Sequence, residues 1–287
     1  MKTNTRYVGG HVSISGGLPN AIANTRKIGG NCLQIFAGSP RLWFRKPFSE
    51  AEVITFLSGI EEHNLGPVFI HALYLVNLAS PNNDLLEKSI TSLVIDIQNG
   101  ARIHAAGVII HIGSHLGAGF DSVKDQLVAV LKRVLAQTEG CDLILENAAG
   151  QNGKIGSLAE LSYLIDKVPD PRLKICLDTA HLFAGGVDLR QESVVKNLIA
   201  DLKHFNILNK LVCLHLNDCA SDLGSHRDLH ANIGDGQIGL EGLKSLVNQK
   251  EFSLLPLILE VPGDKKQGPN LVNITLVRGL IQTKQSH

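Results

Sequence analysis

The sequence predicts an α/β protein: a single (β/α)8 barrel over residues 1–287, with an active site at the carboxyl ends of its strands. Two observations favour this fold class. First, 44% of the 287 residues are hydrophobic, which suits one large core. Second, short β-branched apolar runs alternate with longer helix-compatible segments, and no linker or low-complexity stretch divides the chain. Two doubly wound domains are the alternative, but the regular repetition of these units favours a closed barrel.

Eight apolar runs have the composition of buried parallel strands, and each is followed by enough chain for one helix. Residues 82–104 and 122–137, which lie between such runs, carry apolar side chains at helical spacing. Turn-forming residues such as Gly29-Gly30 and Pro169-Asp170-Pro171 separate the units. The predicted strands are residues 7–14, 32–36, 68–71, 108–111, 143–146, 174–178, 211–216 and 255–260.

Charge and composition exclude several classes of protein. Lys plus Arg and Asp plus Glu both number 27, so any nucleic-acid binding must depend on a local patch of charge. Residues 1–10 carry no apolar segment of signal-peptide length, and no later run approaches the roughly 20 apolar residues of a membrane helix. We therefore expect a cytoplasmic protein without membrane contact. The five cysteines form no CxxC pair, which argues against a disulfide framework and a thiolate zinc site.

Six predicted strands in succession end in a side chain that can bind a metal ion. His, Asp and Glu occupy about one position in seven, so six matches in series are improbable by chance. A single histidine after an apolar run is usually just a hydrogen-bonded, half-buried group. In a β/α barrel, however, all these strand ends converge on one face, where active sites are built. The six residues are His71, His111, Glu146, Asp178, His215 and Glu260.

Two predicted loops add three more candidate ligands. His181 follows the sixth strand, and Asp228 and His230 lie beyond the seventh. The nine groups comprise five imidazoles and four carboxylates with no thiolate, a set that suits Zn²⁺ and also accepts Mn²⁺ or Fe²⁺. Nine ligands are too many for one ion and would serve about three, with positions left open for water and substrate.

These residues and their surroundings resemble the endonuclease IV family of abasic-site endonucleases. Matching segments extend over nearly the whole chain, as GGHVS at residues 9–13, KICLDTAH at 174–181, LHLND at 214–218 and LEVP at 259–262. The resemblance implies a DNA-repair enzyme that hydrolyses the phosphodiester bond 5′ to an abasic site in double-stranded DNA. The products would be a 3′-hydroxyl and a 5′-deoxyribose phosphate. It also implies a monomer with a trinuclear zinc centre, in which Mn²⁺ could replace one ion.

The resemblance also distributes the nine ligands. His71, His111 and Glu146 would hold one zinc ion, and His181, Asp228 and His230 would hold another. The remaining ion would be bound by Glu146, which bridges two ions, and by Asp178, His215 and Glu260. Glu146 and Glu260 are the candidate catalytic residues, which would orient or deprotonate the attacking water. His11 and His115 are candidates for an outer shell around the ligands.

The segment of residues 40–46 mixes cations with aromatic side chains, which suits phosphate contacts and stacking on bases. We expect Arg41, Tyr74 and Leu75 to contact DNA, because the family's matching positions enter the duplex at the abasic site. The alternative is that Trp43, Phe44 and Tyr74 are packing residues.

The chain departs from the family's usual motifs, mostly where small polar or basic side chains are usual. These positions are Leu73, Ile112, Ala148, Cys219, Ala220, Leu229 and Val261. Two other functions stay open. A sugar isomerase or epimerase of the same barrel superfamily would bind one ion through Glu146, Asp178, His215 and Glu260, leaving five candidate ligands without a role. A non-catalytic DNA-damage-binding protein would hold the metals for structure alone.

Overall fold

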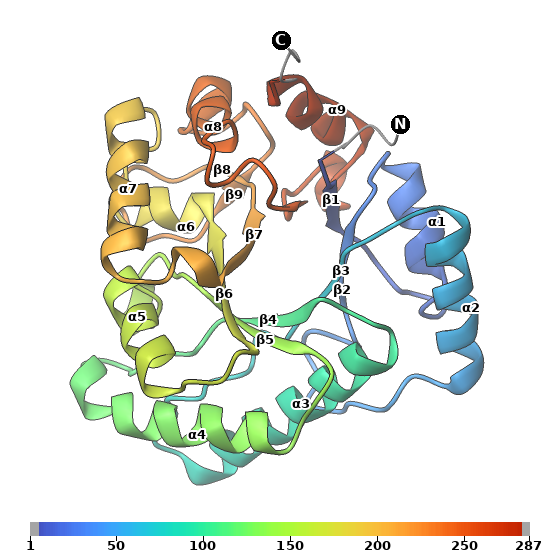
Figure 1. Ribbon diagram of the computed structural model, residues 1–287, viewed down its shortest axis with the longest axis vertical. Coiled ribbons are helices and arrows are strands. Elements are labelled where there is room, and N and C mark those ends of the chain that lie inside the picture. Colours follow the sequence, from blue (N-terminus) through green and yellow to red (C-terminus); the bar gives the residue numbers. More distant parts are fainter. Residues whose placement is uncertain (1–5, 283–287) are drawn as a thin grey trace.

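Eight parallel strands form a closed barrel in the computed structural model, which describes residues 6–282 (Figure 1). The order around the barrel is β1-β10-β7-β6-β5-β4-β3-β2, so strands that follow one another along the chain are also neighbours in space. All eight predicted strands are confirmed, with their ends shifted by a few residues. They are β1 (Val8–His11), β2 (Leu33–Phe36), β3 (Val68–His71), β4 (Gly107–Ile110), β5 (Asp142–Glu146), β6 (Leu173–Asp178), β7 (Leu211–His215) and β10 (Leu257–Leu259).

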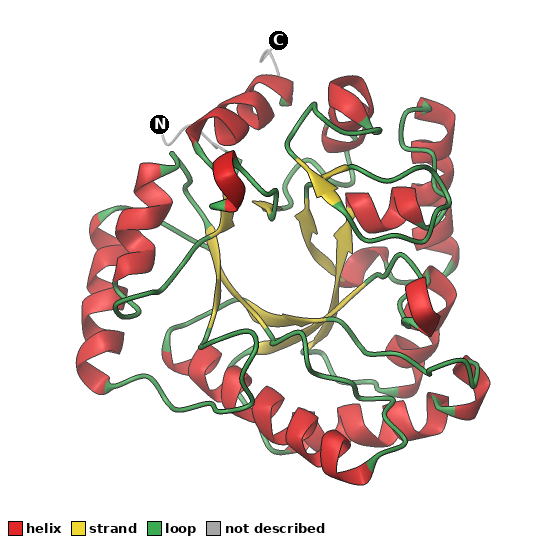
Figure 2. Ribbon diagram, turned by 180° about the vertical axis from the view of Figure 1, so that it is seen from behind, coloured by secondary structure: helices red, strands yellow, loops and turns green. Residues whose placement is uncertain are grey.

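Helices surround the barrel, as the view from behind shows (Figure 2). The helical spacing noted in the sequence is confirmed by the two central helices, α3 and α4. None of the helices in the described part of the chain is long and apolar enough to cross a membrane. The helices are α1 (Asn20–Lys27), α2 (Glu50–Glu62), α3 (Asn83–Arg102), α4 (Lys124–Ala136), α5 (Leu158–Lys167), α6 (Thr179–Ala184), α7 (Glu192–His204), α8 (Gly239–Val247) and α9 (Leu271–Leu280).

Side chains fill the barrel interior in layers, because alternate residues of each strand point inward. One buried apolar layer comprises Cys32, Phe69, Ile109, Ile144, Cys176, Cys213 and Ile258. The residue two positions further along the chain lies in the next layer toward the carboxyl ends of the strands. On six of these seven segments that residue is one of the predicted ligands, and on β2 it is Gln34. The two-residue period of the strands therefore places these polar side chains in a layer directly above the buried apolar layer.

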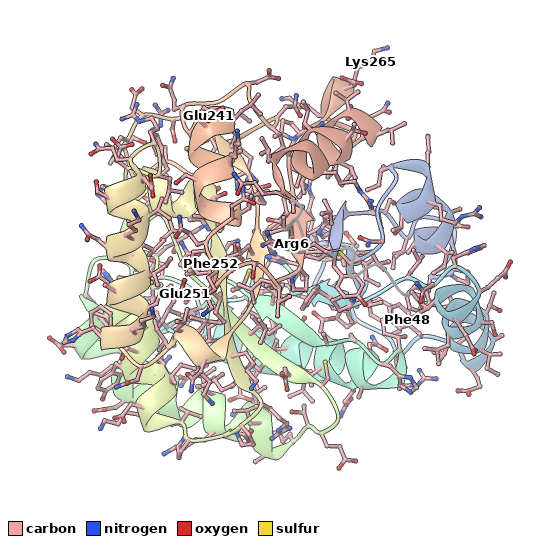
Figure 3. The ribbon with its side chains drawn as sticks, turned by 45° about the horizontal axis from the view of Figure 1, so that its top comes forward. Arg6, Phe48, Glu241, Glu251, Phe252 and Lys265 are labelled. Atoms are coloured by element: carbon pink, nitrogen blue, oxygen red, sulfur yellow. The ribbon has the colours of Figure 1, made fainter. Side chains whose placement is uncertain are left out.

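Arg6, which precedes β1, forms hydrogen bonds with the segment of the chain that leads into β10. Its guanidinium group donates hydrogen bonds to three backbone carbonyls, those of Val247 (2.5 Å), Phe252 (2.5 Å) and Leu255 (3.0 Å). Arg6 and Phe252 lie close together in the side-chain view (Figure 3). Burial lowers the pKa of Arg6 to about 10, so the side chain remains charged at neutral pH. This contact holds the start of β1 against the segment that leads into β10.

Two local features near the site differ from the sequence-based expectation. The residues from Thr179 to His181 do not form the expected loop but begin α6, because the Asp178 carboxylate at the end of β6 accepts a hydrogen bond from the His181 amide (3.0 Å) and caps the helix. In addition, β8 (Asp218–Cys219) and β9 (His230–Ala231) form a short antiparallel pair that the sequence analysis missed. Two-residue strands carry too little pattern to be recognised from sequence.

Candidate metal centre

The nine candidate ligands lie together at the carboxyl ends of the barrel strands. Within each of three groups, the ligand atoms lie within 4.8 Å of one another. Asp228 joins them, since its Oδ1 is 3.1 Å from His181 Nε2 and 3.4 Å from His230 Nε2. The fold therefore collects residues from distant parts of the chain into one cluster. The groups are His71, His111 and Glu146; Asp178, His181 and His230; and Glu146, Asp178, His215 and Glu260.

Glu146 lies at the centre of this cluster. Its side chain is fully buried, and both carboxylate oxygens face imidazoles. Oε2 is 3.3 Å from His71 Nε2 and 3.5 Å from His111 Nδ1. Oε1 is 3.0 Å from His215 Nδ1 and 3.4 Å from His181 Nδ1. This one carboxylate is thus in reach of all three groups.

Hydrogen bonds to backbone carbonyls and to the Gln34 amide orient four of the five histidines. In each case one ring nitrogen is engaged by an acceptor, so the other nitrogen faces the carboxylates, as is usual for histidines that bind metals. The acceptors are the carbonyl of Ala72 for His71 Nδ1 (2.7 Å), of Asn147 for His181 Nδ1 (3.0 Å) and of Glu260 for His230 Nδ1 (3.3 Å), and Gln34 Oε1 for His215 Nε2 (2.8 Å).

The residues present fit a bound metal. His111 Nδ1 and His230 Nε2 are buried and have no hydrogen-bond partner within residues 6–282. Each nonetheless lies 3.5 Å from a carboxylate oxygen, Glu146 Oε2 for His111 and Asp178 Oδ2 for His230. Buried polar atoms without partners are costly, and cations between imidazoles and carboxylates would remove that cost. The mixture of nitrogen and oxygen donors suits zinc.

The carboxylates and imidazoles of the cluster shift one another's pKa values. Burial by itself would raise the pKa of Glu146, but His111 and His215 hold it well below its usual range. Burial likewise opposes the protonated form of His181, yet the carboxylates of Asp178, Asp228 and Glu146 raise the pKa of His181 to about 10. Without metal the cluster is therefore neutralised in part by protons on imidazoles. Metal binding must displace those protons, because a ligating imidazole is neutral.

Gln34 contacts two of the candidate ligands and was not among the residues expected from the sequence. Its side chain is buried on β2, where Oε1 accepts from His215 Nε2 (2.8 Å) and Nε2 donates to Glu260 Oε1 (2.6 Å). The same amide nitrogen lies 2.9 Å from His11 Nδ1. A signal for it existed in the strand period, since Gln34 stands two positions after the inward-facing Cys32. Glutamine escaped notice because it is not a usual metal ligand.

His11 occupies the outer position expected of it, with Nδ1 3.7 Å from Glu260 Oε1. Among the described residues, His115 is hydrogen-bonded within its own loop and not to any of the nine ligands. Its Nδ1 accepts hydrogen bonds from the amides of Gly117 (3.2 Å) and Gly119 (3.0 Å), so it organises its own loop.

The side chains of two buried asparagines, Asn147 and Asn217, form hydrogen bonds with Asp178 and Glu260. Asn217 Nδ2 donates to Asp178 Oδ2 (2.6 Å), and Asn217 Oδ1 accepts from the Glu260 amide (2.7 Å). Asn147 Oδ1 accepts from the Asp178 amide (2.6 Å). These contacts join neighbouring strands and restrict the positions that the two carboxylates can take.

A cleft of about 670 Å³ opens beside the cluster and is lined by residues that include Glu260, Pro40 and Tyr74. Tyr74 is 60% exposed, and its ring centroid lies 5.7 Å from that of His71. Leu75 and Arg41 are also exposed on the loops that follow β3 and β2. Packing therefore does not explain Tyr74.

Two aromatic residues of the loop after β2 differ in their exposure to solvent. Trp43 packs against the core, whereas Phe44 is 75% exposed. Trp43 is therefore a packing residue, whereas Phe44 and Tyr74 are mostly exposed.

A buried ion pair anchors the loop that carries Arg41. Arg45 Nε lies 3.1 Å from Asp96 Oδ1 of α3, and both side chains are fully buried. Arg45 Nη1 also donates to the carbonyls of Ser39 (2.8 Å) and Leu42 (3.2 Å). Burial raises the pKa of Asp96 to about 7, and the Arg45 guanidinium limits that rise. The loop is thereby tied to the helical layer.

The seven departures from the family motifs differ in their burial: Ala148 is half-buried and Ala220 is exposed. Leu73, Ile112, Cys219 and Val261 are buried, so they contribute apolar packing around the cluster. Leu229, next to the ligand Asp228, is instead 47% exposed.

Comparisons with known proteins show that the chain is similar to one family of barrel proteins. Residues 22–276 match a protein family described as xylose isomerase-like TIM barrel. The chain is 36% identical over 278 residues to the probable endonuclease 4 of Chloroflexus aurantiacus, covering 96% of this chain and 98% of that protein. It is 38% identical over 274 residues to the probable endonuclease 4 of Halothermothrix orenii, covering 94% and 99% of the two chains.

Solved structures show the same likeness. The endonuclease IV of Thermus thermophilus superimposes with a TM-score of 0.82 at 34% identity, covering 96% of this chain and 98% of that one. The 3-keto-D-glucoside 4-epimerase of E. coli superimposes with a TM-score of 0.68 at 13% identity, covering 96% and 98% of the two chains. The second likeness is one of fold alone.

Replacing Gln34 should weaken metal binding without unfolding the protein. Gln34→Met keeps the volume but removes the amide that orients His215 and Glu260. Loss of such an outer contact typically lowers metal affinity 10- to 100-fold. Competition with a chromophoric chelator would measure the change. Gln126→Met is the control, because that amide bonds the Leu78 and Ser80 carbonyls outside the cluster. Equal affinities in both variants would contradict the role of Gln34.

Proposed function

The chain belongs to the endonuclease IV family, and from this membership we propose that it is a DNA-repair endonuclease. It cleaves the phosphodiester bond 5′ to abasic sites in double-stranded DNA and leaves a 3′-hydroxyl and a 5′-deoxyribose phosphate. The observation that carries the proposal is the convergence of nine His, Asp and Glu side chains on one face of the barrel. An exposed aromatic and aliphatic surface borders that cluster, where a duplex could bind.

The cluster holds three zinc ions in this proposal, with Mn²⁺ able to replace one of them. The grouping of the ligand atoms supports that number, and the position of Glu146 between groups supports its role as a bridge. His71, His111 and Glu146 bind one ion; Glu146, Asp178, His215 and Glu260 bind the second; and His181, Asp228 and His230 bind the third.

When bound, the zinc ions supply positive charge to the phosphate in the transition state and acidify the attacking water. The protein's own groups position the reactants. Glu260 is suited to orient or deprotonate the water, since its side chain is 15% exposed and lines the cleft. Glu146 is fully buried among four imidazoles, which suits a bridging ligand better. The water oxygen bonds to phosphorus, the bond from phosphorus to the 3′ oxygen breaks, and that oxygen takes up a proton.

Recognition of the lesion falls to the loops after β2 and β3. Arg41, Tyr74 and Leu75 are exposed, and Tyr74 reaches the cleft next to Glu260. A missing base lowers the cost of moving its nucleotide out of the stack, and side chains that fill the gap convert this saving into selectivity. The buried pair of Arg45 and Asp96 holds the first of these loops in place.

Metal analysis of the purified protein should give close to three ions per chain, mainly zinc. Four carboxylates at one barrel end repel one another, and cations held between them and the five imidazoles would balance their charge. Inductively coupled plasma mass spectrometry would count the ions. A single ion per chain would favour a sugar isomerase, because four of the nine residues suffice to bind it.

Glu260→Gln should separate cleavage from binding. The substitution preserves volume but removes the charge that orients the water, so cleavage of an abasic duplex should fall by about 100-fold or more. Binding should weaken far less. A gel assay of cleavage and an anisotropy titration with a labelled abasic duplex measure the two effects. Failure of the unmodified enzyme to cut the abasic duplex would refute the proposed function, and activity of the variant within a few-fold would refute the role of Glu260.

Replacing Arg41, Tyr74 and Leu75 together by Ala should weaken binding to an abasic duplex much more than binding to an undamaged duplex. Only the abasic duplex offers a gap for these side chains to fill. Titrations of both duplexes at one fixed salt concentration would show the difference, with zinc content unchanged. An equal loss for the two duplexes would mean that the three residues act as general phosphate or packing contacts.

A further inference from the structure

Lys154 places a positive charge at the edge of the metal cluster. Its Nζ lies 3.8 Å from Asp228 Oδ2, and among residues 6–282 no other Lys or Arg forms an ion pair with any of the nine ligands. Its charge also acts on His111, where it adds to the lowering of the imidazole pKa that burial begins. Lys154 is therefore near two of the candidate ligands, His111 just after β4 and Asp228 on the loop after β7.

The backbone of Lys154 is held firmly, because the loops after β4 and β5 pair with each other. Lys154 forms an antiparallel bridge with Ser114. Flanking backbone hydrogen bonds extend this pairing, from His115 to the Gly153 carbonyl (3.0 Å) and from Ile155 to the Gly113 carbonyl (3.0 Å). The two loops thus present the lysine from a fixed position next to His111, although neither loop belongs to the barrel sheet.

The ion pair with Asp228 does not use the hydrogen-bonding capacity of the ammonium group. A charge-assisted hydrogen bond measures about 2.7–2.9 Å, which is much shorter than the 3.8 Å observed. The Lys154 side chain is 33% exposed and makes no hydrogen bond through Nζ within the described chain. Asp228 is already engaged by His181 and His230, whose ring nitrogens lie closer to it than Lys154 does. Up to three donors of Nζ are thus available to an anion.

We propose that Lys154 is a substrate-binding residue that donates hydrogen bonds to a backbone phosphate of the DNA held at the metal cluster. This inference rests on the proposed function. A lysine ammonium is a compact charge that suits phosphate oxygens. The neighbouring loop residue Leu229 is exposed but carries no charge, and the exposed Arg227 of the same loop forms no ion pair with any of the nine ligands within the described residues.

The test measures binding rather than turnover, with zinc-loaded Glu260→Gln protein as the parent so that the duplex stays intact. Affinity for an abasic duplex is titrated at several salt concentrations for the parent and for three further substitutions: Lys154→Gln, Lys154→Arg and Lys196→Gln. Lys196 is the control, because it is an exposed lysine of α7 that pairs only with Glu192 on its own helix. Zinc content and thermal unfolding are recorded for every protein.

Lys154→Gln should reduce the slope of log affinity against log salt by about one and weaken binding about five- to tenfold at 0.1 M salt, as expected for one lost phosphate contact. Lys154→Arg should keep most of the slope, and Lys196→Gln should match the parent. An unchanged slope for Lys154→Gln overturns the inference. The inference also fails if Lys154→Gln loses zinc while the slope stays, since that is the behaviour of a counter-ion.

The outcomes also separate this inference from the proposed function. If the parent does not prefer the abasic duplex to an undamaged one, the proposed function and the role of Lys154 both fail. If the parent prefers the abasic duplex and Lys154→Gln leaves the slope unchanged, only the role of Lys154 fails.

Discussion

Four carboxylates crowded at one end of a barrel repel one another, and the structure around them is organised by the need to balance that charge. Five imidazoles face the carboxylates, and four of them are oriented from outside by a carbonyl or by the Gln34 amide. Protons can supply part of the balance in the metal-free protein, but two buried ring nitrogens still lack partners. Bound cations would resolve both problems at once, which is why the geometry of the site favours metal binding.

The closed barrel makes this concentration of charge possible, because it supplies a rigid apolar floor. Inward-facing residues such as Phe69 and Ile144 are fully packed, and the ligand two positions later on each strand follows from the pleat. The same architecture occurs in a 3-keto-D-glucoside 4-epimerase at 13% identity, so the barrel alone does not specify the reaction. The identity of the side chains at the strand ends carries that information.

Chemistry and recognition are built on different parts of the fold. The ligands stand mainly on strand ends, where neighbouring strands and the amides of Gln34 and Asn217 restrict their movement. The surface proposed to read DNA lies on loops, which are fixed more locally, as by the buried pair of Arg45 and Asp96. Several departures from the family motifs replace polar groups by packing residues around the cluster, so tuning of the site can change while the ligands stay the same.

Local patterns were enough to find the eight strands and the nine clustered residues, because strand period and strand-end chemistry are written within a few consecutive positions. They also implied that strand ends meet, since parallel strands in a barrel share one carboxyl face. Only the tertiary structure revealed Gln34, which acts through contacts to His215 and Glu260 far along the chain. It also decided the place of Lys154, whose neighbour Asp228 belongs to another loop. Such contacts join residues that lie far apart in the sequence, so they depend on how separate strands and loops pack and cannot be predicted from a few consecutive residues.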